Sequence, residues 1–423
     1  MTGPDPLYFQ SEMQDALRIA VNRIGTPSYV YFVDRIRSRI EELHTAFGRR
    51  FQISYAVKAN PNAALLRLLK SEIELLDVSS GGELNLALGS GYNAEQLSFS
   101  GPGKSVPELQ LAVSSGCSKI IVESTSELED LDALCAAYCR SISVLLRVNP
   151  QKVPRGFGVN MSGRPSQFGV DEEELADLFR SASRLKHVSI AGLHIYAGTQ
   201  CLDSEAIVEN FGNYIDIFRT YAPMCAGALS DVIFGSGIGI PYHDRDEPVN
   251  LFDIAKHVNP MLDEMRRDHH LHNVNCILEI GRLLVGEAGY FLTRVLRKKE
   301  SRGKNIRILD GGMNCHLAAC GHFGTMIPRN YRMFRLPISK SPGHSTEQMK
   351  SYELFGPLCT TIDQLGRAVE LPTLDVGDVI AIACSGAYGA SASPINFISH
   401  GPPREAVVEY GAGELLIHDV TGV

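Results

Sequence analysis

The sequence predicts an α/β protein that consists of a (β/α)8 TIM barrel and a second, mainly β domain. Eight short apolar or β-branched runs alternate with helical patterns along residues 52–279, which is the order expected of a closed parallel barrel. After about residue 286 the helical periodicity gives way to strand-like runs, which indicates a β domain. The chain has 423 residues, and a barrel alone takes about 250, so the length also favours two domains.

The eight runs are interpreted as barrel strands because helical patterns with apolar residues at helical spacing, such as 63–70 and 82–88, lie between them. Parallel barrel strands present their C-terminal ends at one face, and function gathers there. We therefore look for chemistry at the ends of these strands. The predicted strands are 52–57, 75–79, 97–100, 119–123, 143–148, 189–195, 231–234 and 275–279.

The second domain is predicted from five further strand-like runs. We expect residues 37–285 to form the barrel and residues 1–36 with 286–423 to form the β domain. The five runs are 289–296, 306–309, 352–355, 379–384 and 414–418.

The composition excludes several classes of protein. The formal net charge of -8 gives no basic excess for binding nucleic acid. No apolar run approaches the roughly 18 residues of a membrane span, and no basic and apolar leader opens the chain, so we expect a cytoplasmic protein. The ten cysteines follow no regular spacing, which favours reduced thiols over a disulfide framework.

We expect no metal site. Cys315-His316, Cys320 and His322 lack the spacing of a zinc knuckle and follow a Gly-Gly turn, so a loop that lines a pocket is the preferred interpretation. The histidines at 269, 270 and 272 adjoin charged residues, as in a solvated helix end.

Four features with reactive or anion-binding groups fall at predicted strand ends. Lys58 ends the first strand between apolar neighbours, which would help to desolvate its amine. The sixth strand contains His194, and the eighth ends at Glu279 with Arg282 close behind. The seventh runs into the glycine-rich loop 235–239, where backbone N–H groups can approach a phosphate. Each feature alone has an ordinary structural explanation; together they are much more specific.

Together these features resemble the fold-type III pyridoxal-5'-phosphate (PLP) decarboxylases, the group of the diaminopimelate, ornithine and arginine decarboxylases. The resemblance covers residues 26–416, and the family's fold is an alanine-racemase-like barrel with a β domain. Tyr55-Ala56-Val57-Lys58-Ala59-Asn60 resembles the motif of the lysine that forms the Schiff base with PLP.

The resemblance assigns roles to the other strand ends. His194 is matched to the histidine of His-x-Gly-Ser-Gln, which stacks on the PLP ring, although Ala197-Gly198-Thr199 replaces Gly-Ser. Glu279 is matched to the carboxylate that pairs with the pyridine nitrogen, and Arg282 to a phosphate or substrate contact; Ile280 replaces the family's proline. Gly235, Gly237 and Gly239 are matched to the phosphate loop.

Two motifs of the β domain extend the resemblance. The segment 356–363 resembles the Cys-x-x-x-Asp element, which carries Cys359 and Asp363 and reaches into the neighbouring subunit's active site. The segment 385–389 resembles Cys-Gly-Ala-Tyr-Gly, in which the tyrosine, here Tyr388, contacts the cofactor phosphate. The resemblance therefore implies a homodimer in which the β domain contributes to the interface and to shared active sites.

The sequence departs from the best-known members at the substrate. Where diaminopimelate and ornithine decarboxylases carry Glu or Asp after the cysteine, this chain has Thr360, and a hydroxyl cannot pair with a distal amine. Asp363, Arg329 and Tyr331 are further substrate candidates. These features resemble a biosynthetic branch that includes the butirosin-pathway decarboxylase of a glutamyl carrier protein.

We therefore predict α-decarboxylation of an amino acid or its derivative, either free or tethered to an acyl carrier protein. After the carboxylate leaves, Cys359 is the favoured acid that protonates Cα, and Lys58 is the second candidate. The basic residues of 294–307 could dock an acidic carrier or simply form a solvated hairpin. The alternatives are a conventional diaminopimelate or ornithine/lysine decarboxylase, a racemase and a non-catalytic PLP-binding protein.

Overall fold

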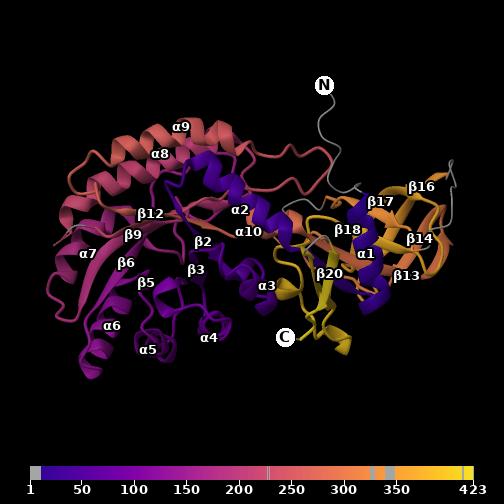
Figure 1. Cartoon of the computed structure of the whole chain (residues 1–423), viewed down its shortest axis with the longest axis horizontal. Coiled ribbons are helices and arrows are strands. Elements are labelled where there is room, and N and C mark those ends of the chain that lie inside the picture. Colours follow the sequence, from indigo (N-terminus) through magenta and orange to yellow (C-terminus); the bar gives the residue numbers. More distant parts are fainter. Residues whose placement is uncertain are drawn as a thin grey trace. The chain divides into compact units, whose positions relative to one another are not determined.

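The structure is a computed structural model that describes residues 11–225, 227, 229–323, 329–338, 348–411 and 414–422. The chain divides into two compact units (Figure 1). The barrel unit comprises Arg37–Ile240 and Glu247–Leu284, and the β unit comprises Met1–Ile36, Pro241–Asp246 and Val285–Val423. Among the described residues, no helix is both long and apolar enough to cross a membrane.

The barrel unit confirms the predicted fold, because all eight predicted strands form and pair in parallel. Neighbours along the chain are hydrogen-bonded to one another, and the additional pairing of β5 with β6 and of β12 with β2 closes the sheet. The strands are β2 (Gln52–Ala56), β3 (Leu75–Val78), β4 (Leu97–Phe99), β5 (Lys119–Val122), β6 (Ile142–Asn149), β9 (Val188–Ile195), β11 (Asp231–Gly235) and β12 (Asn275–Ile280). Two-residue strands β7 (Val159–Asn160), β8 (Val170–Asp171) and β10 (Gly198–Thr199) lie in the loops.

Apolar side chains fill the barrel, and helices cover its outside. One buried cluster joins Leu75, Ile121, Leu145, Ile233 and Ile277 from five strands. α8 and α9 run side by side over the outer surface (Figure 1). The helices that follow the strands are α3 (Ala63–Leu68), α4 (Gly81–Gly89), α5 (Val106–Ser115), α6 (Thr125–Ala137), α7 (Leu175–Ala182), α8 (Ser204–Tyr221), α9 (Leu251–Met265) and α10 (Arg282–Val285).

Side-chain caps explain why several helices begin directly after a strand. The Ser80 hydroxyl accepts from the Glu83 N–H at the start of α4, and Ser124 accepts from Glu127 at the start of α6. Asn250 caps α9 with its side chain too, although a longer segment separates this helix from β11. Such caps satisfy N–H groups that a helix leaves unpaired, so they set each turn at the strand end.

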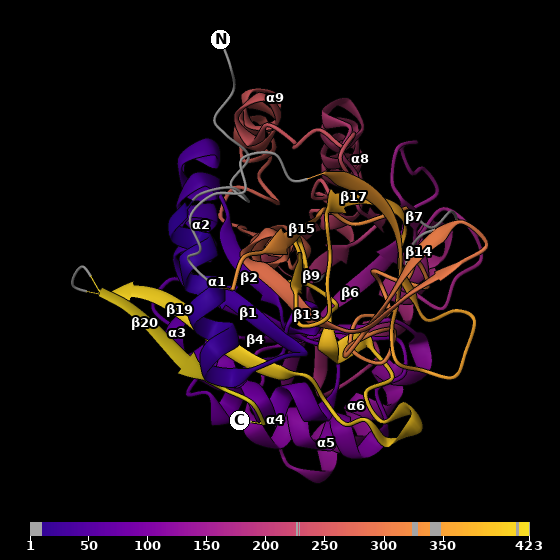
Figure 2. The same cartoon turned by 90° about the vertical axis from the view of Figure 1, so that its right-hand side faces the viewer.

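The β unit contains the five predicted strands and four that the sequence analysis missed. The predicted ones are β13 (Gly289–Ser301), β14 (Lys304–Leu309), β16 (Met349–Phe355), β18 (Val379–Ile382) and β20 (Glu414–Asp419). The missed ones are β1 (Ser28–Phe32), β15 (Met333–Leu336), β17 (Gln364–Pro372) and β19 (Arg404–Gly411). β1 pairs in parallel with β19 and antiparallel with β13, so the start and end of the chain meet in one sheet (Figure 2).

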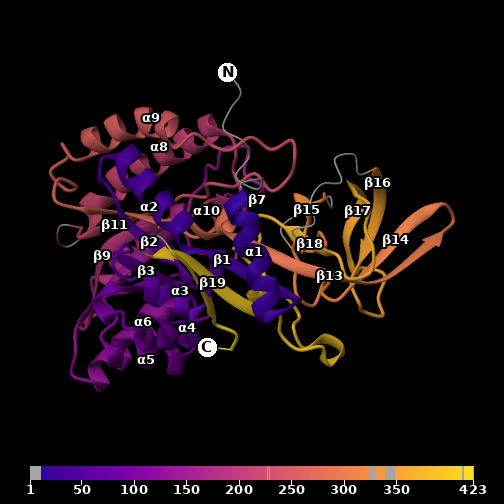
Figure 3. The same ribbon diagram turned by 45° about the vertical axis from the view of Figure 1, so that its right-hand side comes forward.

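Two helices and one hairpin complete the description. α1 (Ser11–Ile24) precedes β1 in the β unit, and α2 (Val33–Phe47) follows it. β13 and β14 form a long hairpin whose β14 edge continues into β16 and β17 (Figure 3).

Candidate active site

The amine of Lys58 lies between two buried carboxylates at the C-terminal ends of barrel strands. Lys58 belongs to a short 3-10 turn, Val57–Ala59, directly after β2. Its Nζ is 3.3 Å from Oδ2 of Asp77 at the end of β3 and 3.5 Å from Oε1 of Glu279 at the end of β12. The lysine side chain is 39% exposed, whereas the carboxylates are 0% and 3% exposed. The amine is thus partly accessible to solvent, and the two carboxylates stabilise its positive charge.

The two carboxylates differ in acidity. Burial, reinforced by the charge of Glu279, raises the pKa of Asp77 to about 7, against the opposing effect of Lys58. Burial acts in the same direction on Glu279, but Lys58 and the hydrogen bond from His194 outweigh it and lower the pKa of Glu279 to about 2. Two carboxylates beside one amine cannot ionise equally. Glu279 is therefore the stronger acid of the two, and Asp77 takes up a proton at higher pH than Glu279 does.

His194 is the buried partner of Glu279. Its Nε2 lies 2.9 Å from Oε2 of Glu279, and its side chain is 1% exposed. Burial lowers the pKa of His194, although Glu279 acts in the opposite direction. A neutral ring beside an ionised carboxylate donates from Nε2–H, and Nδ1 has no hydrogen-bond partner among the described residues.

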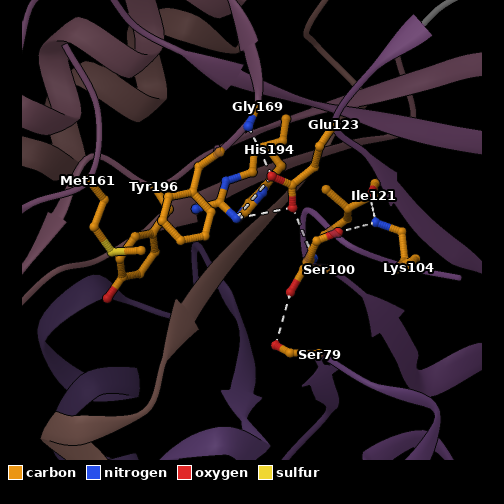
Figure 4. A network of polar contacts seen from close by, with 12 residues as sticks. Ser79, Ser100, Lys104, Ile121, Glu123, Met161, Gly169, His194 and Tyr196 are labelled. Carbon is orange, nitrogen blue, oxygen red and sulfur yellow. Dashed lines mark hydrogen bonds and ion pairs between the residues drawn. The ribbon is translucent and has the colours of Figure 1, made fainter. Parts of the chain in front are cut away.

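A second buried ion pair, which the sequence analysis missed, lies next to His194 (Figure 4). Arg147 of β6 donates to Glu123, which follows β5, at 3.2 Å, and the guanidinium carbon of Arg147 lies 4.6 Å from the centroid of the Phe168 ring. Glu123 also accepts the N–H groups of Gly101 and Gly169, each at 2.9 Å. This carboxylate therefore fixes two barrel loops and neutralises Arg147. Arg147 lies opposite His194 in the register of β6 with β9.

The glycine loop 235–240 is hydrogen-bonded to the segment that follows β9. Cys201 N–H donates to the Gly237 carbonyl at 3.0 Å, and Gly239 N–H donates to the Cys201 carbonyl at 2.8 Å. The Gln200 side chain donates to the Ile240 carbonyl and accepts its N–H, at 2.7 and 3.2 Å. The N–H groups of Gly237 and Ile238 have no partner among the described residues. Two backbone donors thus remain for an anion.

The glycines of this loop are required by close packing. A Cβ on Gly235 would overlap the Tyr196 ring, and one on Gly237 would overlap the Gly198 carbonyl and the Phe157 ring. Gly237 also has φ +62°, a left-handed conformation that favours glycine. The sequence predicts a phosphate loop here, and the backbone geometry is suited to an anion.

Arg282 opens α10 directly behind the loop that follows Glu279, and its side chain is half-buried. Gly281 precedes it, and a Cβ there would lie 3.0 Å from Cβ of Ala59. The ends of β12 and β2 can therefore approach closely, which keeps Glu279 beside Lys58.

The β unit contains the remaining predicted residues. Cys359 is exposed and Thr360 half-buried. Asp363 is 1% exposed, and its two oxygens accept the N–H groups of Met313 and Leu358, at 2.5 and 2.8 Å. Asp363 thus anchors the loop that carries Cys359 to the turn at Met313, and both oxygens are already used in this structure.

Tyr388 is half-buried, with φ +54° and its ring centroid 5.7 Å from that of Phe323. Arg329 is exposed and lies 3.4 Å from Asp246. Tyr331 is buried among aromatic rings; its centroid is 4.8 Å from that of Tyr242 and 5.3 Å from that of His316. Tyr331 therefore belongs to a packed aromatic cluster.

The cysteine and histidine groups do not converge on a metal site. Cys315, His316 and Cys320 are buried, but His322 is exposed and contacts the Ile362 carbonyl. No group of three potential metal ligands occurs in the described part of the chain.

Asp77, Glu123 and Arg147 are three buried charged residues of the barrel that sequence reasoning missed. All three occur within or at the end of a predicted apolar strand. A charge in a strand that is otherwise apolar costs several kcal/mol to bury unless it is paired. That pattern is the signal that could have identified them.

Comparison with known proteins agrees with this geometry. Residues 33–286 match the family model described as "Pyridoxal-dependent decarboxylase, pyridoxal binding domain". The chain is 34% identical over 403 residues to the L-glutamyl-[BtrI acyl-carrier protein] decarboxylase of Niallia circulans, covering 95% of this chain and 93% of the relative. It is 32% identical over 408 residues to the diaminopimelate decarboxylase of Methanothermobacter thermautotrophicus, covering 95% and 91%.

Among solved structures, the diaminopimelate decarboxylase from M. jannaschii is similar, with a TM-score of 0.83 and 27% identity over 96% of this chain and 91% of that one. The residues present fit PLP: an accessible amine, a carboxylate of low pKa 3.5 Å from it, and a glycine loop with two unpaired N–H donors. These meet the needs of the aldehyde, the ring nitrogen and the phosphate. On the sequence match and this geometry together, the chain belongs to the pyridoxal-dependent decarboxylase family.

Proposed function

We propose that the protein removes the α-carboxylate of an amino acid or an amino-acid derivative, with PLP held on Lys58. The observation that carries this proposal is the Lys58 amine, placed 3.3 and 3.5 Å from two buried carboxylates of unequal acidity. Asp77 can exchange a proton near neutral pH with an amine that changes its bonding, while Glu279 keeps its charge.

The residues of the barrel unit divide the remaining work. Bound PLP supplies an electron sink for the electron pair that the departing carboxylate leaves at Cα. Glu279, whose pKa Lys58 and His194 lower, would stabilise a proton on the ring nitrogen. The N–H groups of Gly237 and Ile238, together with Arg282, would hold the phosphate.

Cys359 is proposed to return a proton to Cα, and Lys58 is the second candidate for this donor. The exposed position of Cys359, on a loop anchored by buried Asp363, is suited to a thiol that acts across a subunit interface. We infer a homodimer in which each Cys359 serves the neighbouring subunit's active site, with Tyr388 as a phosphate contact. Thr360, Arg329 and Tyr331 remain candidates for substrate contacts.

The substrate is proposed to lack a distal ammonium group and to be carrier-tethered. Thr360 offers no charge to such a group, and the relative in Niallia circulans acts on a glutamyl carrier protein. On the β13–β14 hairpin, Arg297, Lys299 and Arg302 are exposed and form no ion pair within the described ranges. These three residues, called the hairpin cations below, would attract an acidic carrier.

A conventional diaminopimelate decarboxylase is the second candidate, because a diaminopimelate decarboxylase is 32% identical over nearly the whole chain. The two functions make opposite demands on Thr360. A distal ammonium needs a counter-charge at the site, and a neutral hydroxyl leaves that charge poorly paired.

The experiment is a panel that measures CO2 release from free amino acids, including diaminopimelate, ornithine and lysine, and from aminoacyl carrier thioesters. We expect release from a thioester substrate with retention of PLP. Turnover of free diaminopimelate at a higher kcat/KM than every thioester would support the second candidate. Inversion at Cα with the carboxylate retained would identify a racemase, and bound PLP with no turnover of any compound would favour the non-catalytic alternative.

A further inference from the structure

The ring that faces Lys58 belongs to Tyr196. The Nζ atom of Lys58 lies over this ring, 5.9 Å from its centroid. The same atom lies 3.3 Å from Asp77 and 3.5 Å from Glu279. A Cβ on Gly235 would overlap Cδ2 and Cγ of Tyr196, so the ring also rests on the start of the glycine loop. Tyr196 therefore contacts the groups that surround both the amine and the phosphate loop.

His194 and Tyr196 lie at the C-terminal end of β9 (Val188–Ile195) and differ in burial. His194 belongs to the strand, and Tyr196 follows it directly, toward the barrel mouth. His194 is 1% exposed and hydrogen-bonded to Glu279, whereas Tyr196 is half-buried. The imidazole is thus enclosed against Glu279, and the phenol ring is the more exposed of the two rings.

The backbone around Tyr196 is fixed on both sides. The Ser162 hydroxyl donates to the Tyr196 carbonyl at 3.2 Å, and the Ala197 N–H donates to the Tyr214 hydroxyl at 2.9 Å. Met161 N–H donates to the Ala197 carbonyl at 2.9 Å. A side chain held on such a backbone is preorganised as a binding surface.

The spacing of the motif agrees with the structure. Tyr196-Ala197-Gly198-Thr199-Gln200 fits the five-residue pattern His-x-Gly-Ser-Gln without a gap, with Tyr for His and Thr for Ser. A match that starts at His194 needs two extra residues. The Gln200 side chain also occupies a defined place, because it bonds both backbone groups of Ile240 at the end of the glycine loop.

We propose that Tyr196 supplies the aromatic face against which the PLP ring packs, and that His194 is a positioning residue that orients Glu279 through its hydrogen bond. The inference rests on the proposed function, because it requires PLP at Lys58. Two residues of one strand end then have separate roles, since Tyr196 supports the ring of the cofactor and His194 fixes the partner of the ring nitrogen.

The test measures PLP affinity and the pH dependence of the bound-cofactor absorbance in the purified holoenzyme. Tyr196→Phe should bind PLP within about twofold of wild type. Tyr196→Leu and Tyr196→Ala should both raise the dissociation constant about three- to tenfold, the range of one aromatic contact, and should weaken visible circular dichroism. None of the three substitutions should shift the pH at which the absorbance of bound PLP changes.

His194 variants should give the opposite pattern. His194→Ala removes the hydrogen bond that helps to lower the pKa of Glu279, so the pH transition should shift upward. His194→Gln keeps a donor and should restore the wild-type transition. Tyr196→Leu, which keeps an apolar side chain, carries the test if Tyr196→Ala fails to fold.

Wild-type affinity in Tyr196→Leu would overturn the assignment of the aromatic face. Loss of affinity in both His194 variants, with an unshifted pH transition, would overturn the positioning role. A separate outcome bears on the proposed function: borohydride reduction of the wild-type holoenzyme should attach PLP to Lys58. If it does not, the proposed function fails, whatever the Tyr196 variants show.

Discussion

The Nζ atom of Lys58 lies 3.3 Å from Oδ2 of Asp77, a carboxyl group with no exposed surface. Ser100 donates to the same oxygen at 3.1 Å, and Ser98 donates to the other at 3.4 Å. Because burial and Glu279 raise the pKa of Asp77 to about 7, this group is protonated below neutral pH and ionised above it. It is therefore the group of this site that responds to pH near neutrality.

Asp77→Asn should remove the transition near pH 7 from the pH profile of kcat/KM and should lower its maximum about 10- to 100-fold, the range for a lost charged hydrogen bond. Ser100→Ala is the matched control. It keeps the carboxylate but removes a hydrogen bond that lowers the pKa of Asp77, so the transition should move to higher pH. An unchanged profile in Asp77→Asn would show that another group titrates.

Lys58→Ala should abolish the covalently linked cofactor and lower kcat by at least about 10³-fold. The measurement is borohydride reduction followed by peptide mass analysis, with Lys186→Ala, at an exposed lysine of the barrel unit, as the control. Linked cofactor at another lysine in the wild-type protein would contradict the assignment.

The shared active site predicts complementation between inactive variants. Lys58→Ala and Cys359→Ala should each be nearly inactive, and Cys359→Ala should still bind PLP. Random reassociation of equal amounts forms heterodimers with one intact site, which restores about a quarter of wild-type activity. The same mixture should remain inactive if Cys359 serves its own subunit, provided that mass spectrometry confirms exchange.

Reversal of the hairpin cations tests carrier docking. Arg297→Glu, Lys299→Glu and Arg302→Glu together should lower kcat/KM for a carrier-linked substrate about tenfold or more at low salt, because charges at an interface rim steer association. Turnover of the same amino acid as a small thioester should be unchanged. Charge reversal at the exposed residues Arg180, Arg184 and Lys186 of the barrel unit is the control. An equal effect of both triple variants would rule out a specific docking surface.

His316 predicts a pH-dependent stability. The ring is fully buried; its Nε2 lies 3.0 Å from the Ser385 hydroxyl, and its Nδ1 accepts the Ala319 N–H. Burial lowers its pKa to about 3, whereas an unfolded histidine titrates near 6.5. Because the folded pKa is the lower one, the stabilising contribution is complete above about pH 6.5 and is lost as the pH falls toward 3.

Between pH 7.5 and 5 this histidine should lower the free energy of unfolding by about 2 kcal/mol. His316→Gln keeps a donor and an acceptor and should remove that part of the pH dependence. Urea denaturation of both proteins at the two pH values is the measurement. An equal loss of stability in both would contradict the assignment.

The barrel could be predicted from sequence because each strand is an apolar run and each is followed by its own helix. Lys58 and Glu279 were identifiable for the same reason, since both end such runs. β1, β15, β17 and β19 could not be predicted, because they are short or polar and their partners lie far away in the chain; β1 and β19 are separated by more than 370 residues.

The site was harder to predict where depth decides the role. The sequence shows a histidine near the right place, but only the structure separates His194, buried against Glu279, from Tyr196, nearer the mouth. Asp77, Glu123 and Arg147 were missed for a related reason. Their ion-pair partners come from different strands, so no nearby residue in the sequence indicates that these charges can be buried.

Hydrogen bonds from Gln200 and Cys201 to the glycine loop join the segments after β9 and β11 into one part of the site. A substitution that displaces one segment must displace the other, so binding of the PLP phosphate and packing of Tyr196 against the PLP ring would be lost together. The substrate-recognition candidates Thr360 and Arg329 lie outside this part, in the β unit. Substitutions that adapt the protein to a new substrate could therefore change Thr360 and Arg329 without changing the residues that would bind the cofactor.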